Sequence, residues 1–446
     1  MTYESVVSAL YELGHELAHT PSHKFDLAHM RVLLEALGNP QNSFKSVLIA
    51  GTNGKGSTAA TLASILRTAG HNTGLYTSPH LVRVNERIRV DGTEISDPDF
   101  ATVYGKVEAK CQALIANSAL PWHPSFFEML TAMAFLHFAS AGVEIAVLEV
   151  GMGGRLDATN VVEPVVSVIS DIDLDHQKFL GNTIAEIAAE KAGIIHEGGL
   201  LVTLPQHPQA NDVIGRTAME RHARAISASQ YVPSMTPAAD WGAKNRYPLR
   251  VMGNDIEVDS PLVGRHQMRN IALAITAAEQ LNLAGVRLSA SDVERGIRET
   301  KWPGRFQVIA AAEGYPEMVL DVAHNPAGAW ALRSALSDRY EGRKITLLFG
   351  VLRDKAVHDI TQILFPIADH VVATEVDNPR TASVAEMVEA AARTGTEAVP
   401  ATSVRDGIEK ARELAEKDGV IVVTGSIYLV GAALRCISVK VSDGTC

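Results

Sequence analysis

Three glycines, a lysine and a serine lie within seven residues of the chain, Gly51-Thr-Asn-Gly-Lys-Gly-Ser57. Because glycine has no side chain, the backbone here can bend so that several N–H groups point at one anion. Lys55 adds a positive charge, and the Ser57 hydroxyl is a suitable ligand for Mg²⁺. The pattern predicts a loop that binds a nucleoside triphosphate; the alternative is a glycine-rich turn with an incidental lysine. The residues expected at the phosphates are Thr52, Asn53, Gly54, Lys55, Gly56 and Ser57.

Glu149 lies at the carboxyl end of the apolar segment 144–150, and His176 comes soon after the apolar segment 164–170. In open parallel sheets, ligands bind at the edge formed by the carboxyl ends of the strands. At that edge the Glu149 carboxylate could reach the same metal ion as Ser57. A neutral His176 imidazole could bind Mg²⁺ or orient a water molecule. The alternatives are a carboxylate that caps a helix and an ordinary surface histidine.

The segments around these residues have the patterns of buried strands and of helices. Several apolar runs are rich in Val and Ile on both faces, which indicates parallel strands covered by helices. Helical spacing predicts helices at residues 58–67, 125–139 and 183–193, and the first would turn its positive N-terminal end toward the phosphates. The fold class is therefore α/β with a mostly parallel, doubly wound sheet. The strands are expected at residues 46–50, 73–77, 144–150, 164–170 and 200–204.

A chain of 446 residues is too long for one ordinary core, which predicts two domains. A Pro-Gly pair at 303–304 interrupts the rhythm after a helical stretch, and a second set of strands follows. We therefore expect a phosphate-loop domain over residues 1–300 and a smaller Rossmann-like domain over residues 301–446. Residues 206–262 contain several prolines and are expected to form loops and a small strand pair. The second set of strands is expected at residues 306–311, 318–322, 345–351, 371–376 and 420–423.

Composition excludes several classes of protein. The formal net charge of −11 argues against a nucleic-acid partner, because phosphate backbones favour clustered Lys and Arg. No apolar run approaches the roughly 20 residues that a membrane span needs. The first residues lack a basic region followed by an apolar one, so a cytoplasmic protein without membrane contact is expected. Cys111, Cys436 and Cys446 are few and far apart, which predicts free thiols.

Eight sequence blocks, in the same order and over most of the chain, resemble the folylpolyglutamate synthase and dihydrofolate synthase family of the Mur ligase superfamily. The first block is the phosphate loop, which departs from the common G-x-x-x-x-G-K-[ST] pattern but matches the shorter form of this superfamily. The resemblance implies a Mur-ligase-like N-terminal domain and a smaller Rossmann-like C-terminal domain. The blocks are G-T-N-G-K-G-S (51–57), T-S-P-H-L-V-R-V-N-E-R (77–87), E-V-G-M-G-G-R-L-D-A-T-N (149–160), D-H-x-x-F-L-G-N-T (175–183), E-K-A-G-I (190–194), P-G-R-F (303–306), D-V-A-H-N-P (321–326) and T-G-S-I-Y-L-V-G (424–431).

The resemblance implies roles for residues around ATP and two Mg²⁺ sites. Ser57, Ser78, Glu149 and His176 match the family's magnesium residues. Asn270, Arg305 and Asp321 join the loop residues 52–57 in holding ATP, and His324 is placed near the γ-phosphate or the incoming glutamate. An inter-domain structural contact is the alternative for His324. Lys55, Lys191 and His324 are the residues expected to be catalytic.

Lys191 matches a family lysine that is carbamylated, so that its carboxylate helps to hold the second Mg²⁺. A carbamate forms from the neutral amine, and deprotonating an ordinary lysine at pH 7 costs roughly 4 to 5 kcal/mol. From its residue type alone, Lys191 would be an exposed helical lysine. Asp171 and Asp173 depart from the family, which usually has small or hydroxylated residues there, and their effect is left open.

For the folate substrate, the resemblance points to residues in three segments. An aromatic ring at Phe127 can stack on a pterin or aminobenzoyl ring, and the Asp157 carboxylate can accept from pterin N–H groups. The alternative for Phe127 is an ordinary core position at a helix start. The expected substrate-binding residues are Asp26, Leu27, Arg31, Ser125, Phe127 and Asp157.

The implied activity is an ATP-dependent ligase that adds L-glutamate to a folate through an acyl phosphate. The sequence leaves open whether it acts on dihydropteroate, on tetrahydrofolate or on both. Two other hypotheses stay open: a Mur-type amino-acid ligase of cell-wall precursors, and a nucleotide-switch module without chemistry. A monomer is expected, and a requirement for a monovalent cation is not decided.

Overall fold

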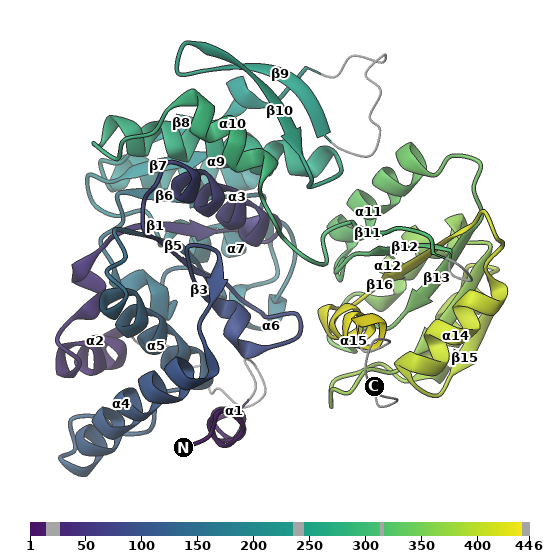
Figure 1. The fold of residues 1–446 in the computed structure, drawn as a ribbon, viewed down its shortest axis with the longest axis horizontal. Coiled ribbons are helices and arrows are strands. Elements are labelled where there is room, and N and C mark those ends of the chain that lie inside the picture. The colour runs from purple at the N-terminus through teal and green to yellow at the C-terminus, as the bar shows by residue number, and fades with distance from the viewer. Residues whose placement is uncertain (15–26, 235–244, 313–315, 439–446) are drawn as a thin grey trace. The chain divides into compact units, whose positions relative to one another are not determined.

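The central strand of the larger sheet, β1 (Lys45–Ala50), leads directly into the phosphate loop (Figure 1). Its sheet has the order β4-β3-β2-β5-β1-β6-β7-β8, and its strands run parallel except at β3, which is antiparallel to β2 and to β4. Within β1, every residue but the first is buried. The other strands are β2 (Thr73–Tyr76), β3 (Ile88–Val90), β4 (Thr93–Glu94), β5 (Ile145–Glu149), β6 (Val166–Ile169), β7 (Leu200–Thr203) and β8 (Arg224–Ser227).

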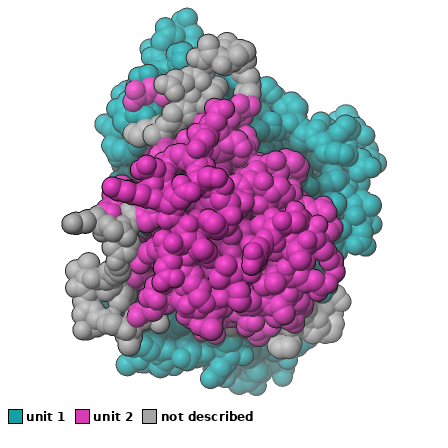
Figure 2. All heavy atoms as spheres, turned by 90° about the vertical axis from the view of Figure 1, so that its right-hand side faces the viewer, with its two compact units in different colours: residues 1–234, 247–259, 268–300 teal, residues 235–246, 260–267, 301–446 magenta. Residues whose placement is uncertain are grey.

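The computed structural model describes residues 1–14, 27–234, 245–312 and 316–438. The chain forms two compact units, coloured separately in Figure 2. The first contains residues 1–234, 247–259 and 268–300. The second contains residues 235–246, 260–267 and 301–446.

Helices cover both faces of the larger sheet. In Figure 1, α3, α9 and α10 lie on one face, and α2, α4 and α5 lie on the other. A buried apolar cluster of the second group with the sheet forms much of the core of this unit. The α-helices are α1 (Tyr3–Glu12), α2 (Leu27–Ala36), α3 (Lys55–Thr68), α4 (Asp97–Ala116), α5 (Phe126–Ser140), α6 (Gln177–Leu180), α7 (Ile184–Ala192), α8 (Pro208–Glu220), α9 (Arg265–Leu283) and α10 (Ala290–Arg298). The 3-10 helices are η2 (Pro40–Ser43), η3 (Val84–Arg87), η4 (Ala158–Val161) and η5 (Ser229–Tyr231).

The second unit is built on a six-stranded sheet of order β11-β12-β16-β13-β14-β15. Only β11 is antiparallel to its neighbour; the other pairs are parallel. Its strands are β11 (Gln307–Ile309), β12 (Glu317–Leu320), β13 (Ile345–Phe349), β14 (His370–Thr374), β15 (Ala398–Ala401) and β16 (Val420–Thr424). Its helices are α11 (Pro326–Arg339), α12 (Val357–Leu364), η6 (Phe365–Ile367), α13 (Val384–Arg393), α14 (Val404–Leu414) and α15 (Ile427–Ser438).

The mostly parallel α/β architecture expected from the sequence is confirmed in both units. The expectation for residues 206–262 is wrong in part. The strand pair exists as β9 (Asn245–Val251) and β10 (Asn254–Ser260), but α8 is a regular helix and β8 extends the larger sheet. Pro208 occupies the start of α8, where a proline suits the helix because the missing N–H would have no helical partner.

Cys111 is a free, buried thiol as expected, but Cys436 is disulfide-bonded, so the expectation of a free thiol is wrong there, because a small number of cysteines does not prevent two of them from pairing. Over the described residues, no helix combines the length and the apolar character needed to cross a bilayer.

Candidate active site

The phosphate loop occupies the turn between β1 and α3. Gly51 and Gly54 have φ angles of 151° and 88°, which L-residues with side chains rarely adopt. Because α3 begins at Lys55, the N–H groups of Lys55, Gly56 and Ser57 have no acceptor within the helix and form its positive end. This geometry suits an anion at the end of α3.

Asn270 from α9 lies against the same loop. Its side chain is buried, and a Cβ atom on Gly54 would lie 2.1 Å from Asn270 Oδ1. Position 54 therefore requires a glycine, both because its backbone is left-handed and because Asn270 approaches it so closely. The structure thus brings Asn270 together with the predicted phosphate residues, although Asn270 lies far from them in the sequence.

Lys55 and Lys191 meet at the first residue of the loop. Lys55 Nζ donates to the carbonyl oxygens of Gly51 at 3.1 Å and Thr52 at 3.3 Å. Lys191 Nζ donates to the Gly51 carbonyl at 2.7 Å. Lys191 is only 4% exposed, so the interpretation of its residue type as an exposed helical lysine is wrong.

Burial changes the acid–base behaviour of Lys191. It lowers the pKa of the amine to about 7, and the nearby Lys55 charge acts in the same direction. Asp175 and Asp157 oppose this shift but do not cancel it. Near neutral pH, a large share of Lys191 is therefore the neutral amine that carbamate formation requires.

Glu149 and Ser78 also lie together. Glu149 ends β5, which pairs with β1 so that Ile49 lies opposite Glu149. The Glu149 side chain is buried, and its Oε2 accepts a hydrogen bond from the Ser78 backbone N–H at 3.2 Å. The register of the two strands therefore places this carboxylate at the sheet edge where the phosphate loop begins.

His176 lies on the segment that follows β6. Its backbone is left-handed, with φ of 52°, and its N–H donates to Asp175 Oδ1 at 2.8 Å. Its ring Nε2 lies 3.8 Å from Asp175 Oδ2. Over the described part of the chain, no three His, Cys, Asp or Glu side chains are arranged to hold a metal ion by themselves. Mg²⁺ in nucleotide sites commonly uses one or two carboxylates and completes its shell with substrate phosphates and water, so the donors Ser57 and Glu149 fit it.

The predicted folate residues lie in different settings. Asp26 is outside the described residues, while Leu27 is half-buried and Arg31 is exposed on α2. Ser125 caps α5 in a reciprocal capping box with Glu128. Phe127 packs its ring against Tyr76, with centroids 5.9 Å apart, and lies against Gly151.

Asp157 is buried and bound to its own loop. Oδ1 accepts from the Thr159 N–H and hydroxyl at 3.0 and 2.5 Å, and Oδ2 accepts from the Met152 N–H at 3.0 Å. Burial raises the pKa of Asp157, and these hydrogen bonds partly offset the shift. The carboxylate therefore holds the 151–160 loop in shape.

In the second unit, Asp321 organises the start of the domain. Its carboxylate accepts from the backbone N–H groups of Phe306 at 2.8 Å and Ala323 at 2.9 Å. Burial raises the pKa of Asp321, and the Arg305 charge is the largest opposing influence. His324 Nδ1 donates to the Val322 carbonyl at 2.9 Å, which fixes the ring. Arg305, Asp321 and His324 are thus neighbours in one segment of this unit.

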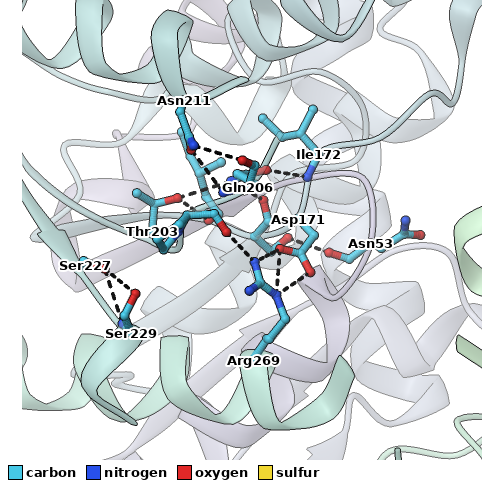
Figure 3. Close-up of polar contacts among 12 residues, drawn as sticks. Asn53, Asp171, Ile172, Thr203, Gln206, Asn211, Ser227, Ser229 and Arg269 are labelled. Atoms are coloured by element: carbon cyan, nitrogen blue, oxygen red, sulfur yellow. Dashed lines mark hydrogen bonds and ion pairs between the residues drawn. The ribbon is translucent and has the colours of Figure 1, made fainter. Parts of the chain in front are cut away.

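Two residues beside the phosphate loop escaped the sequence prediction. Arg269 forms a two-point ion pair with Asp171, whose role the sequence left open (Figure 3). Gln206 Oε1 accepts from the Ile172 N–H at 2.8 Å. An acidic residue directly after a strand was the available signal, but nothing local in the sequence indicates its distant partner.

Comparisons with known proteins agree on one family. The Mur ligase middle domain model matches residues 49–278, and the Mur ligase glutamate ligase domain model matches residues 304–427. The dihydrofolate synthase/folylpolyglutamate synthase of Bacillus subtilis is 34% identical, over 91% of this chain and 93% of the relative. The corresponding protein of Mycobacterium tuberculosis is 35% identical, over 96% of this chain and 93% of the relative.

Solved structures of similar proteins have the same fold. The structure of Mycobacterium tuberculosis folylpolyglutamate synthase complexed with ADP and AMPPCP is 34% identical, with a TM-score of 0.86 over 99% of this chain and all of the other. Escherichia coli FolC in complex with DHPP and ADP is 28% identical, with a TM-score of 0.85 over 99% of each chain. Matches of this length, with the geometry of the phosphate loop, establish the identity of the fold and of its family. The chain belongs to the folylpolyglutamate synthase/dihydrofolate synthase family of Mur ligases.

Proposed function

We propose that this protein is an ATP-dependent ligase that forms an amide bond between a folate carboxylate and L-glutamate. The observation that carries the proposal is the convergence of the Lys55 and Lys191 amines on the Gly51 carbonyl of the phosphate loop, in a chain of this family. The relatives are named as dihydrofolate and folylpolyglutamate synthases, and this chain matches them over nearly their whole length, which favours this function over a cell-wall ligase. A nucleotide-switch module without chemistry would not need to match both the Mur ligase middle domain and the glutamate ligase domain.

The reaction follows from the low reactivity of a carboxylate. An oxygen of the folate carboxylate attacks the γ-phosphorus of ATP, the bond to the β–γ bridging oxygen breaks, and ADP leaves. The amine of glutamate then attacks the acyl carbon of the acyl phosphate, inorganic phosphate leaves, and the nitrogen loses a proton. The protein mainly positions the reactants and neutralises charge, so the loop N–H groups and Lys55 are the central contributors.

Ser57, Ser78, Glu149 and His176 are proposed to hold Mg²⁺. When bound, the ion neutralises charge on the transferring phosphoryl group. The burial of Ser57 and Glu149 and the contact between Glu149 and Ser78 support this assignment. Two magnesium sites are proposed, and a monovalent cation is a candidate addition.

Lys191 is proposed to carry the carbamate that completes the second magnesium site. Its amine attacks CO₂ and loses a proton, which gives a carboxylate on the lysine nitrogen. The cost of deprotonation is largely met by burial, since the pKa of the amine is already about 7. The buried position beside Gly51 supports this proposal.

The remaining assignments are proposals from family resemblance. Asn270, with its side chain against Gly54, is a candidate ATP ligand. Arg305, Asp321 and His324 are candidate ligands for ATP or glutamate in the second unit. Leu27, Arg31, Ser125, Phe127 and Asp157 are candidates for folate binding, together with Asp26, and a monomer is proposed.

The deciding experiment measures ADP release with Mg²⁺ and glutamate, separately with dihydropteroate and with tetrahydrofolate. We expect glutamate-dependent release with at least one of the two substrates, and the ratio identifies the preferred one. Lys55→Ala should abolish it, while Lys45→Ala, an exposed change at the start of β1, should not. No glutamate-dependent release with either folate, or full turnover by Lys55→Ala, would refute the proposal.

A further inference from the structure

A short segment after β6, residues 170–173, holds one side of the phosphate loop; we call it the bracket. The Asp171 carbonyl accepts from the N–H groups of Thr52 at 2.8 Å and Asn53 at 3.1 Å. Asp173 N–H donates to the Thr52 hydroxyl, which in turn donates to the Asp173 carbonyl, both at 3.0 Å. Ser170 Oγ donates to the Asn53 carbonyl at 2.8 Å. The positions of Thr52 and Asn53 therefore follow the position of the bracket.

Arg269 fixes the bracket from α9. Its Nε lies 3.0 Å from Asp171 Oδ2, and its Nη2 lies 2.5 Å from Asp171 Oδ1 (Figure 3). Nη2 also donates to the Pro205 carbonyl at 3.0 Å. Two parallel N–H···O bonds set direction as well as distance, which a single contact cannot do. The arginine thus ties the bracket to both α9 and the segment after β7.

The residue next to Arg269 reaches the loop directly. Asn270 lies on the same helix, and its Oδ1 occupies the space that a Cβ on Gly54 would need. Helix α9 is consequently connected to the phosphate loop at two places, through Asp171 to Thr52 and Asn53, and through Asn270 to Gly54. A shift of α9 relative to the bracket would change both contacts together.

We propose that Arg269 is a positioning residue for nucleotide binding: its ion pair with Asp171 sets the phosphate loop and Asn270 in register with each other. The inference rests on the proposed function, because it names how the nucleotide site is held. Arg269 acts through Asp171 and does not itself bind the phosphates.

The test is a double-mutant cycle on the binding of Mg·ADP, measured by isothermal titration calorimetry. Arg269→Met and Asp171→Ala should each raise the Kd for Mg·ADP by about five- to tenfold, and the double variant no further, because both break the same connection. Arg269→Lys should fall between, since it keeps the charge but loses the paired geometry. Asp171→Asn, which keeps the size of the side chain, provides the same test if Asp171→Ala does not fold.

Controls separate positioning from general stability. In Arg269→Met and Asp171→Ala, the Kd for dihydropteroate and the KM for glutamate should stay within about twofold of the wild-type values, while the KM for ATP rises. Arg298→Met, which removes a pair with Glu294 within α10 at 2.9 Å, should leave the Kd for Mg·ADP unchanged.

Three results would overturn the inference. These are an unchanged Kd for Mg·ADP in Arg269→Met, equal weakening of ADP and dihydropteroate binding, and additive effects in the double variant, as expected if Arg269 binds phosphate directly. A wild-type protein that binds no Mg·ADP would instead refute the proposed function on which the inference rests.

Discussion

The side-chain amines of Lys55 and Lys191 donate to the same acceptor, the carbonyl oxygen of Gly51, at 3.1 and 2.7 Å. Lys55 belongs to the first turn of α3 and Lys191 to the last turn of α7, so two helices deliver amines to one backbone atom. The burial of Lys191 and, to a smaller extent, the repulsion between the two amines lower the pKa of the Lys191 amine. The arrangement prepares a neutral amine next to a phosphate loop.

The first prediction concerns stability and pH. The folded-state pKa of Lys191 is about 7 and its ordinary value is 10.5, so the unfolded chain binds more protons between these values. The cost of burying Lys191 is therefore full below pH 7 and declines as the pH rises toward 10.5. Lys191→Met should raise the free energy of unfolding by an amount on the order of a few kcal/mol at pH 6.5, and by less at pH 9.5.

Urea unfolding of the metal-free protein at several pH values measures this difference. Lys106→Met, an exposed change on α4, should show a difference from wild type that does not vary with pH. A constant difference between Lys191→Met and wild type from pH 6.5 to 9.5 would show that Lys191 titrates like an ordinary lysine.

The second prediction concerns the carbamate. Protein equilibrated with ¹³C-bicarbonate and Mg²⁺ should show one carbamate carbonyl signal by NMR, because Lys191 offers a neutral amine at neutral pH. The signal should be absent in Lys191→Met and retained in Lys106→Met. A signal that survives in Lys191→Met would place the carbamate on another lysine.

The third prediction concerns Mg²⁺. Glu149→Gln keeps an acceptor for the Ser78 N–H but removes the charge, so the fold should be preserved while metal binding weakens. We expect the Mg²⁺ concentration for half-maximal ADP release to rise by at least about tenfold, since even residues that only support a metal ligand have effects of this size. Glu144→Gln, just before the same strand and exposed, is the matched control. Equal Mg²⁺ dependence in both variants would contradict the assignment of Glu149.

The fourth prediction uses two glycines with the same backbone. Gly54 and Gly70 both have φ of 88°, but a Cβ would clash with Asn270 at Gly54 and meet nothing within 4 Å at Gly70. Alanine at either position carries a backbone strain of roughly 1 to 3 kcal/mol. Only Gly54→Ala should also weaken Mg·ADP binding, by about tenfold or more, because the loop and Asn270 must move apart. Similar Kd values for the two variants would mean that the contact with Asn270 does not matter for the nucleotide.

Local patterns predicted much of the fold and part of the site. The buried parallel strands could be predicted from apolar runs, and the phosphate loop could be predicted from its glycines. Both predictions succeed because these patterns depend on residues that are adjacent in the chain. The helix α8 was missed because Pro208 was taken as a loop signal, whereas it occupies the first turn of a helix that His207 caps.

The features that the sequence did not predict depend on packing between residues far apart in the chain. Lys191 is buried where the last turn of α7 meets Gly51 of the phosphate loop, and no residue near Lys191 in the sequence carries that information. Arg269 and Asp171 are 98 positions apart in the sequence, and only the fold brings α9 to the end of β6. Electrostatic properties such as the lowered pKa of Lys191 follow from these contacts and not from residue type.

A crystal structure of the protein with AMPPCP and Mg²⁺ tests the proposed nucleotide site most directly. We expect the β- and γ-phosphates within hydrogen-bond distance of the loop N–H groups and of Lys55 Nζ, and a magnesium ion bound by Ser57 and Glu149. Phosphates bound elsewhere, or a metal ion with neither Ser57 nor Glu149 among its ligands or the residues that hold its waters, would contradict it.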